Sequence, residues 1–454
     1  MSITDTCQPI PSGFAQLPEV EVIEIVAESE VSHTLFWYQP QLDEVTRDIA
    51  KMRTLRGFGR STPGNGILCY ELFPNITDHM ECMSMSNDSL RSTFVAITAL
   101  ICDLSLRRPP GEVYYTEKSK SLRLIQEAIS TGALDASLFT AVLMQVFSDL
   151  CLGNLRAIQH HLRGMFQIFK RLQQTSSATE LSPDLLFFRR IAARTDSAQA
   201  SLFEDFPQWP AFTPLDELDD RQVLSTLSGI SKNMAPENVE WALASFEIDN
   251  LWHRVYTFAK RSDISRKSGD PNAEESILIQ YQALTQTFDS WKHRTIVFWQ
   301  ENIERDAQQH ILPSEHKPFL LFEQLNLQNH FYGKLMNQWR AIYICAATTL
   351  NPFPGPDYHS SKILECAIDM CRTHAALGND GIAGPQWQCL FYAGIIFGKE
   401  FVDECDWIME RCRQAAAAFP VITPAVESMP MVWNAETVHW NALGRLWPGV
   451  GREP

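Results

Sequence analysis

The chain has 454 residues, of which 45% are hydrophobic, and it carries a formal net charge of −16. This hydrophobic content is enough for a sizeable core. The excess of acidic residues argues against a broad nucleic-acid-binding surface, because phosphate contacts require clustered Lys and Arg, and it leaves only local basic clusters open. The 11 cysteines are scattered, mostly in apolar runs, which is typical of reduced thiols in the cytosol or nucleus. Neither a secretory signal nor an apolar stretch of the roughly 18 residues that a membrane-spanning helix needs is present.

Composition divides the chain into three parts. Residues 1–45 mix Pro, Glu and Val without a helical period and are expected to be a flexible lead-in. Residues 46–420 are expected to form one large helical domain around a single core, which opens with a loop-forming stretch at 56–66. Residues 421–454 form a tail whose tryptophans are expected to dock back on the domain: Trp433, Trp440 and Trp447.

The most regular periodicity lies between residues 89 and 172. Apolar residues recur there at spacings of three and four, which predicts four consecutive α-helices. Asp135 is the expected N-cap of the third helix, and Gly132 and Gly153 are expected to end the second and third. The third helix is apolar nearly all round and should be the buried one of the group. Short links predict that consecutive helices pack antiparallel.

The apolar face of the second helix carries one Ala, two Tyr and three aliphatic residues at helical spacing: Tyr114, Tyr115, Leu122, Ile125, Ala128 and Ile129. The fourth helix, 155–172, has its own inner face of five apolar residues: Ile158, Leu162, Met165, Phe166 and Phe169. Both patterns predict amphipathic helices.

The rest of the chain alternates breaks with further helical patterns. Residues 206–220 are a Pro- and acid-rich connection, followed by less regular amphipathic segments to 260. Residues 261–273 are polar and are expected to be the most mobile internal loop. Helical patterns follow at 274–309, 317–349, 360–377 and 386–418, with a break at 351–356, where the sequence reads NPFPGP. The fold class is therefore predicted to be all-α.

The order of these segments resembles the fungal-specific transcription factor domain, the helical region C-terminal to the binuclear zinc cluster of many fungal regulators. A tyrosine-bearing helix, an Asp-led Leu-rich helix and a His-Leu-x-Gly helix occur in the order typical of that family. A later "aromatic, Gly, tryptophan" pattern is similar as well. The residues that carry the resemblance are 115–124, 135–147, His161, Leu162, Gly164, 187–196, Phe206, Pro207 and 387–408, within 85–415 overall.

The zinc cluster that accompanies this domain is not found in the sequence. It needs six thiolates in two C-x2-C-x6-C halves, whereas Cys7 is the only cysteine before Cys69 and no C-x2-C pair occurs. Cys405 and Cys412 share the spacing but lie at i, i+7 on a predicted helix without a third ligand, so we expect half-buried core thiols. The chain therefore resembles the regulatory half of such a factor, unless an upstream coding stretch supplies the cysteines.

The resemblance implies a nuclear, or nucleocytoplasmic, transcription regulator that acts through protein–protein contacts. Its expected partners are other transcription factors or the transcription machinery, in a homo- or heterodimer, and its expected targets are a gene set such as a specialised-metabolism cluster. DNA binding would be indirect or would need a missing domain. Neither a G-x-S-x-G elbow nor a phosphate-binding glycine loop occurs. No catalytic, cofactor-binding or metal-ligating residue is predicted.

Two histidines adjoin on the fourth helix. Side chains at i and i+1 diverge by about 100°, so His160 and His161 do not ligate one metal ion together. We expect His161 to be buried or half-buried and bonded to a neighbouring helix. Gly164, nearly one turn on, is expected to let another helix approach closely.

An acidic run at 216–220 offers an alternative function. Asp216 has Asp219 and Asp220 one turn away, as in the metal-binding motif of helical terpenoid synthases. The run follows Pro214, and no second metal-binding triad follows downstream, so a solvated helix start is the favoured interpretation. A helical scaffold without transcriptional output is a further alternative.

Two further clusters carry weaker hypotheses. The basic residues Lys260, Arg261, Arg266 and Lys267 fit either a nuclear import signal or, as we favour, a solvated loop. Aromatic residues recur at mostly helical spacing near the end of the domain, where core packing is the default interpretation. The family resemblance implies a second interpretation, in which these aromatic residues line a pocket for a small apolar effector. These aromatic residues are Trp387, Phe391, Tyr392, Phe397, Phe401 and Trp407.

Overall fold

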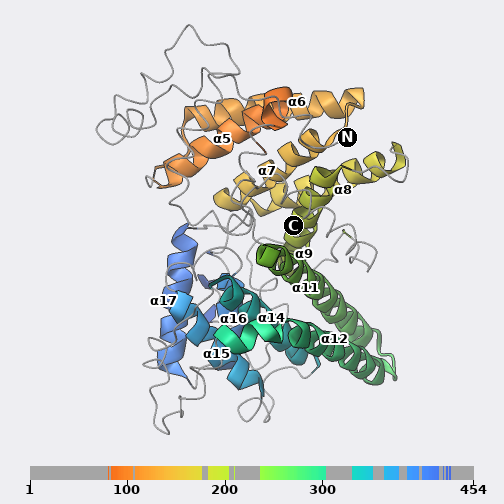
Figure 1. The fold of residues 1–454 in the computed structure, drawn as a ribbon, viewed down its shortest axis with the longest axis vertical. Helices are drawn as coiled ribbons and strands as arrows, with labels where there is room; N and C mark the ends of the chain where they lie inside the picture. Colours follow the sequence, from red (N-terminus) through yellow and green to blue (C-terminus); the bar gives the residue numbers. More distant parts are fainter. Residues whose placement is uncertain are drawn as a thin grey trace. The chain divides into compact units, whose positions relative to one another are not determined.

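A computed structural model gives the fold (Figure 1), and every regular element in its described part is α-helical. The all-α prediction is confirmed. The described residues are 80, 83–105, 108–175, 182–203, 209, 236–302, 330–350, 362–377, 386–397, 401–418, 423, 426, 427, 429 and 430. The principal helices are α5 (Asp88–Ser105), α6 (Glu112–Thr131), α7 (Ala136–Leu152), α8 (Leu155–Thr175), α9 (Pro183–Phe203), α11 (Pro236–Ser268), α12 (Ala273–Asn302), α14 (His330–Leu350), α15 (Lys362–Leu377), α16 (Gln386–Phe397) and α17 (Val402–Ala418).

The chain divides into two compact units. The described part of the first unit comprises α5, α6, α7 to Leu150, α8 from Arg156 and the start of α9. The second unit takes over at Arg190 within α9 and includes α11 to α17, together with the short link Cys151–Leu155.

The first unit is built around α7. Its side chains are buried without interruption from Leu138 to Asp149, which confirms that the all-round apolar pattern marks the central helix. The Asp135 carboxylate accepts a hydrogen bond from the backbone N–H of Leu138 at 2.6 Å, as predicted for an N-cap. Gly132 and Gly153 both adopt positive φ, at 76° and 72°, where the preceding helices end.

The second unit is built around α14. This helix packs against α11, α12, α15 and α16, and nearly all of its side chains from Leu335 to Thr349 are buried. Helices α11 and α12 contact each other as a long pair, visible in green in Figure 1, joined by a turn in which Gly269 has φ of 71°. This turn is only a few residues long because α11 runs on to Ser268.

The predicted polar loop at 261–273 is therefore wrong for most of its length. Arg266 lies on α11 and donates hydrogen bonds to the carbonyl oxygens of Thr349 and Leu350 at 2.8 and 3.0 Å. These carbonyls end α14 and have no partner inside their own helix. The favoured interpretation of the basic cluster as a solvated loop fails with it, because the tertiary contact made by Arg266 holds this part of α11 helical.

Other predictions need correction at single residues. Tyr114 and Ile125 are buried as expected, but Tyr115, Leu122 and Ile129 are exposed, so the buried face of α6 is narrower than its apolar pattern. The helical pattern at 386–418 is divided into α16 and α17.

The lead-in at 1–45, the breaks at 56–66 and 351–356, and the tail tryptophans lie outside the described residues. None of the described helices is long and apolar enough to cross a membrane.

Candidate functional site

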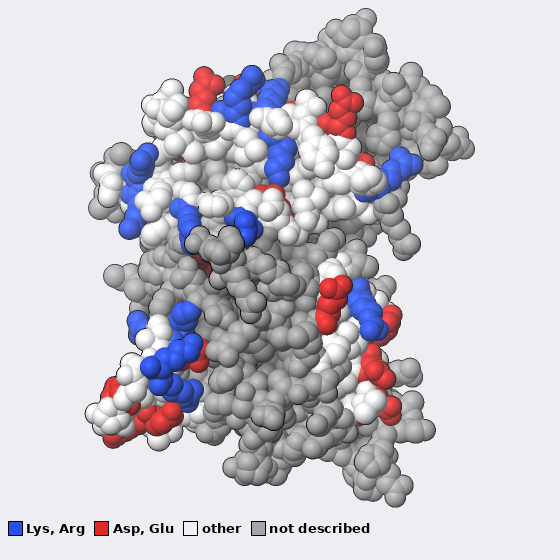
Figure 2. Space-filling view, turned by 180° about the vertical axis from the view of Figure 1, so that it is seen from behind, with Lys and Arg blue, Asp and Glu red and all other residues white. Residues whose placement is uncertain are grey.

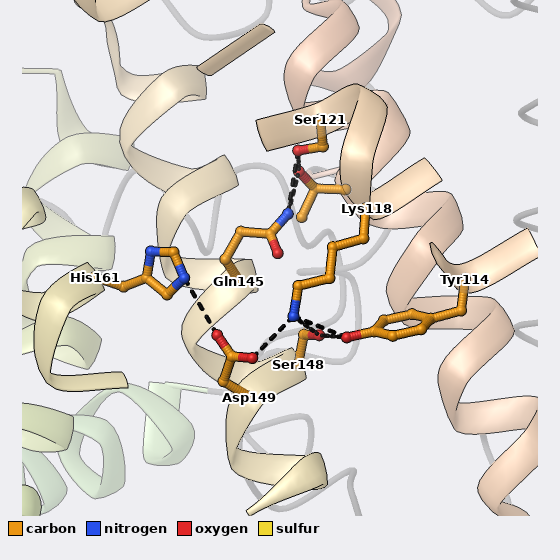
Figure 3. A network of polar contacts seen from close by, with 8 residues as sticks. Tyr114, Lys118, Ser121, Gln145, Ser148, Asp149 and His161 are labelled. Carbon is orange, nitrogen blue, oxygen red and sulfur yellow. Dashed lines mark hydrogen bonds and ion pairs between the residues drawn. The ribbon is translucent and has the colours of Figure 1, made fainter. Parts of the chain in front are cut away.

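A buried network of charged and hydroxyl side chains joins α6, α7 and α8 in the first unit (Figure 3). Tyr114 and Lys118 stand one turn apart on α6, so both side chains point to the same side of that helix. Ser148 and Asp149 lie near the end of α7, and His161 reaches in from α8. Three helices that are separate in sequence thus contribute to one cluster.

The Lys118 ammonium is at the centre of this network. It donates to the Tyr114 hydroxyl and to Oδ1 of Asp149, both at 2.8 Å, and more weakly to Oγ of Ser148 at 3.4 Å. The hydroxyls of Tyr114 and Ser148 are 2.7 Å apart. On the other side, Nε2 of His161 lies 3.2 Å from Oδ2 of Asp149. The Asp149 side chain is 1% exposed, whereas those of Lys118 and His161 are 18% and 23% exposed.

A second polar cluster lies one turn earlier in α7 and joins it to α5 and α6. The Gln145 side-chain amide donates to Oγ of Ser121 at 3.1 Å and to Oγ1 of Thr93 at 3.4 Å. Ser121 and Thr93 also bond to each other, and Thr93 donates to the backbone carbonyl of Ser89 at 2.7 Å. Because a one-residue slip of any helix would leave these buried groups without partners, the two clusters fix the register of the first unit.

The electrostatics of the network oppose proton transfer at neutral pH. Burial by itself raises the pKa of Asp149, but hydrogen bonds and charge from His161 and Lys118 lower it more, so this pKa lies below the usual value. Burial lowers the pKa of Lys118, and Asp149 and Tyr114 more than offset this, so the pKa is raised. A general acid or base works best with a pKa near the operating pH. Both shifts move the pKa values further from neutral pH, so Asp149 stays a carboxylate and Lys118 stays an ammonium.

The tyrosine, lysine and serine of the network are chemically able to relay a proton, but their placement does not suit a substrate. The side chains of Tyr114 and Ser148 are buried, and each hydroxyl already bonds to the other and to Lys118. A buried polar group that loses its partner costs about 1–3 kcal/mol. The arrangement therefore stabilises the packing of three helices.

The second unit contains a buried carboxylate in a different setting. Asp249 of α11 lies 3.2 Å from Nε of Arg194 on α9, and its side chain is 11% exposed. Burial raises the pKa of Asp249 to about 6, although the charges of Arg194 and Arg190 lower it in part. Here the desolvation cost exceeds the attraction of the cations, and the carboxyl group titrates close to neutral pH.

Residue Trp209 is held between the same two helices. Its backbone N–H donates to Oδ2 of Asp196 on α9 at 3.0 Å, and its carbonyl oxygen is 2.8 Å from Nε2 of His253 on α11. The indole is 1% exposed. A connection that the sequence marks as Pro- and acid-rich is thus fixed at this point by one buried tryptophan.

Residues 82–443, well over half of the chain, match the fungal-specific transcription factor domain. The chain belongs to the fungal-specific transcription factor domain family. Searches of curated proteins and of solved structures each gave no match. The resemblance identified from the sequence is thereby confirmed, and the networks described above are features of one member of this family.

The His-Leu-x-Gly motif of this fungal-specific transcription factor domain has mixed outcomes. His161 is half-buried and contacts Asp149 of the neighbouring α7, as predicted. Gly164 is exposed, and a Cβ built on it would meet nothing within 4 Å, so the predicted close helix approach is wrong. Leu162, between them, is buried. The motif therefore contributes one polar contact and one apolar contact.

The remaining predicted residues lie mostly in the core. Cys405 and Cys412 are buried thiols, rather than half-buried ones, and burial raises the pKa of each to about 12. Phe391, Tyr392 and Phe397 are buried, as core packing predicts, and the apolar effector stays a prediction. Asp216, Asp219 and Asp220 are outside the described residues. Within the described part, no group of three or more His, Cys, Asp and Glu side chains is arranged to hold a metal ion.

Sequence reasoning missed Tyr114, Lys118 and Asp149 as a unit. A usable signal was present, because Gln145 and Asp149 stand in a helix that is otherwise mostly apolar. Buried polar groups are nearly always hydrogen-bonded, so both residues required partners on neighbouring helices. Which helix supplies the cation is a tertiary fact, since Lys118 is 31 residues from Asp149 in sequence.

Proposed function

We propose that this chain regulates transcription in the nucleus by binding other proteins through its helical surface. The observation that carries the proposal is the family match over residues 82–443. The buried ion pair of the first unit joins α6 to α7 and is accounted for by helix packing. The partners are a DNA-bound factor or the transcription machinery.

In this proposal, promoter recognition is supplied by a partner chain. The sequence contains no C-x2-C pair, and its net charge of −16 repels nucleic acid. A dimer with a zinc-cluster factor, or with a second copy bound to one, would bring the helical domain to its genes. An upstream coding stretch with six cysteines would instead place DNA recognition in this protein itself, and sequencing of the transcript's 5′ end distinguishes the two.

The test compares transcripts of the native host with and without this gene. The proposal predicts a coherent block of altered genes, such as one specialised-metabolism cluster, that re-expression restores. Chromatin immunoprecipitation of the tagged chain should place it at the promoters of that block. Unchanged transcripts under conditions where the protein is made would overturn the proposal. Magnesium-dependent consumption of an isoprenyl diphosphate by the purified chain would point to the enzyme alternative.

A further inference from the structure

Helix α8 is basic in an otherwise acidic chain. Its 21 residues contain Arg156, Arg163, Lys170 and Arg171 but no Asp or Glu, and all four basic side chains are exposed. In the upper part of Figure 2, several blue patches of Lys and Arg side chains are visible, with fewer red ones among them. The positive charge of this helix contrasts with the net charge of −16 of the whole chain.

The basic residues follow a regular spacing along the exposed side of α8. Arg156, Arg163 and Lys170 are seven residues apart, which places them about 10.5 Å apart along the axis. Exposed imidazole and amide side chains fill the gaps at intermediate positions. Together these residues form the basic stripe of α8, at alternating spacings of four and three: Arg156, His160, Arg163, Gln167, Lys170 and Gln174.

The stripe lies away from the apolar side of α8, although the Lys170 ammonium also lies 4.8 Å from the centroid of the Phe166 ring. The packing of α8 uses the opposite side, where the buried residues are Ile158, Leu162, Met165, Ile168, Phe169 and Leu172. Arg156 lies in the first turn, where a cation opposes the helix dipole and a carboxylate would be favourable. The last turn, where basic residues would favour the helix, contains none. The stripe therefore has the features of an interaction surface.

The spacing of the stripe matches another helix. Side chains that alternate at four and three residues form a nearly straight seam, which is the geometry by which two helices lie alongside each other. A second copy of α8 would bring like charges together on that seam and is disfavoured. Duplex DNA presents a charge every ~3.4 Å per strand along its axis, so one straight row of cations about 10.5 Å apart would meet few phosphates.

We propose that the basic stripe of α8 is the docking surface for an acidic helix of a partner protein, with Asp or Glu recurring every seven residues. The carboxylates would face Arg156, Arg163 and Lys170, and the amides of Gln167 and Gln174 would hydrogen-bond between them. This proposal rests on the proposed function, since it specifies the surface through which the regulator binds another protein.

The test uses the full chain and a defined probe, a labelled 21-residue Ala-rich peptide with Glu at alternating spacings of four and three. Binding is measured by fluorescence anisotropy at low and at physiological salt. The double variant Arg156→Glu/Lys170→Glu is compared with Arg123→Glu/Arg413→Glu. Both pairs change four units of charge at exposed side chains, but Arg123 lies on α6 and Arg413 on α17. A peptide with Gln in place of Glu and a 21-base-pair duplex are the controls.

The proposal predicts that the stripe variant binds the acidic peptide roughly tenfold or more weakly, because two opposite-charge pairs become like-charge pairs. The control variant and the unchanged melting temperature of both variants would exclude a general loss of charge or fold. Equal weakening by both variants, or no binding of the peptide, would overturn the proposal. Stripe-dependent binding of the duplex but not the peptide would overturn it in favour of nucleic acid.

Transcripts separate this proposal from the proposed function. If deletion of the gene alters a block of transcripts and the stripe variant restores that block fully, the regulator stands and the docking surface is rejected. If deletion alters nothing, the proposed function is rejected whatever the peptide measurement gives. Loss of the block in the stripe variant, with restoration by the control variant, is the expected result.

Discussion

Two buried aspartates, one in each unit, show how differently the same side chain is used. Asp149 in the first unit and Asp249 in the second both lie about 3 Å from cationic side chains. The pKa of Asp149 is lowered by His161 and Lys118, in spite of its burial. Burial raises the pKa of Asp249 to about 6, in spite of Arg194 and Arg190.

The difference lies in hydrogen bonding. Asp149 accepts a hydrogen bond from the Lys118 ammonium at 2.8 Å, and Lys118 also donates to the Tyr114 hydroxyl at 2.8 Å. Asp249 is paired through a single contact at 3.2 Å. A charge removed from water is stabilised only where direct bonds replace its hydration. The first unit is therefore expected to depend on its buried charges, and the second unit to tolerate their removal.

The largest expected effect follows from Asp149→Asn. The substitution leaves the Lys118 ammonium buried without its anion, which costs about 3–5 kcal/mol. Hydrogen exchange of the amides of α6, α7 and α8 should report the loss, while α14 and α15 keep their protection.

The double variant Lys118→Met/Asp149→Leu is the matched control for this prediction. Replacing both charges of a buried pair by apolar groups of similar volume is often neutral, so protection of α6 to α8 should return to near the wild-type level. Protection that stays low in the double variant would show that the charges themselves are not the cause.

A smaller effect is expected for Asp249→Asn. The carboxyl group is only weakly stabilised, so the substitution should cost about 1 kcal/mol or less. The prediction fails if the amides of α9 and α11 lose as much protection from hydrogen exchange in Asp249→Asn as the amides of α6 to α8 lose in Asp149→Asn.

The pH dependence of the two units should also differ in sign. Because the pKa of Asp249 is raised to about 6, the folded chain holds a proton between about pH 4 and 6 that the unfolded chain has released. Ionisation of the buried Asp249 carboxyl therefore destabilises the folded chain, and the folded chain is more stable at pH 5 than at pH 7 as far as this group is concerned. The lowered pKa of Asp149 gives the reverse, a contribution lost as pH falls below about 4. Exchange rates corrected for intrinsic pH effects, with Asp249→Asn as the control, measure both.

A further pair of substitutions tests the tip of the α11–α12 pair, where we expect one moderate effect and one near zero. Arg266→Gln removes two hydrogen bonds from the charged side chain to the last carbonyls of α14 and should cost about 1–2 kcal/mol. Glu274, which pairs with Arg266 at 2.9 Å, is largely exposed, so Glu274→Gln should lie near zero. Equal losses in thermal unfolding would mean that the ion pair, rather than the helix end, matters.

In the first unit, the helix ends and the buried central helix α7 were predictable because the sequence signals for them are local. Asp135 bonds three residues along the chain, and Gly132 supplies a left-handed conformation that most residues disfavour. The loop predicted at 261–273 failed because Arg266 bonds to residues more than 80 positions away. The polar residues of this segment favoured a loop. The hydrogen bonds from Arg266 to the end of α14 instead stabilise the helical form of this part of α11.

The polar network was predictable only in part. His161 was expected to bond a neighbouring helix, and it does. The partner of Lys118 was not identifiable, because a lysine on an amphipathic helix is normally solvated. The exposed apolar residues Tyr115, Leu122 and Ile129 share the same limitation, since spacing alone does not show which side of α6 meets α7.

The most direct measurement is a comparison of transcripts in three strains of the native host: wild type, gene deletion, and the deletion expressing Lys118→Met/Asp149→Leu. If the chain is a regulator whose buried charges stabilise the fold and take no part in a reaction, deletion alters a block of genes and the double variant restores it. A double variant that is folded and present at the wild-type level, yet leaves the transcripts as in the deletion, would contradict the account.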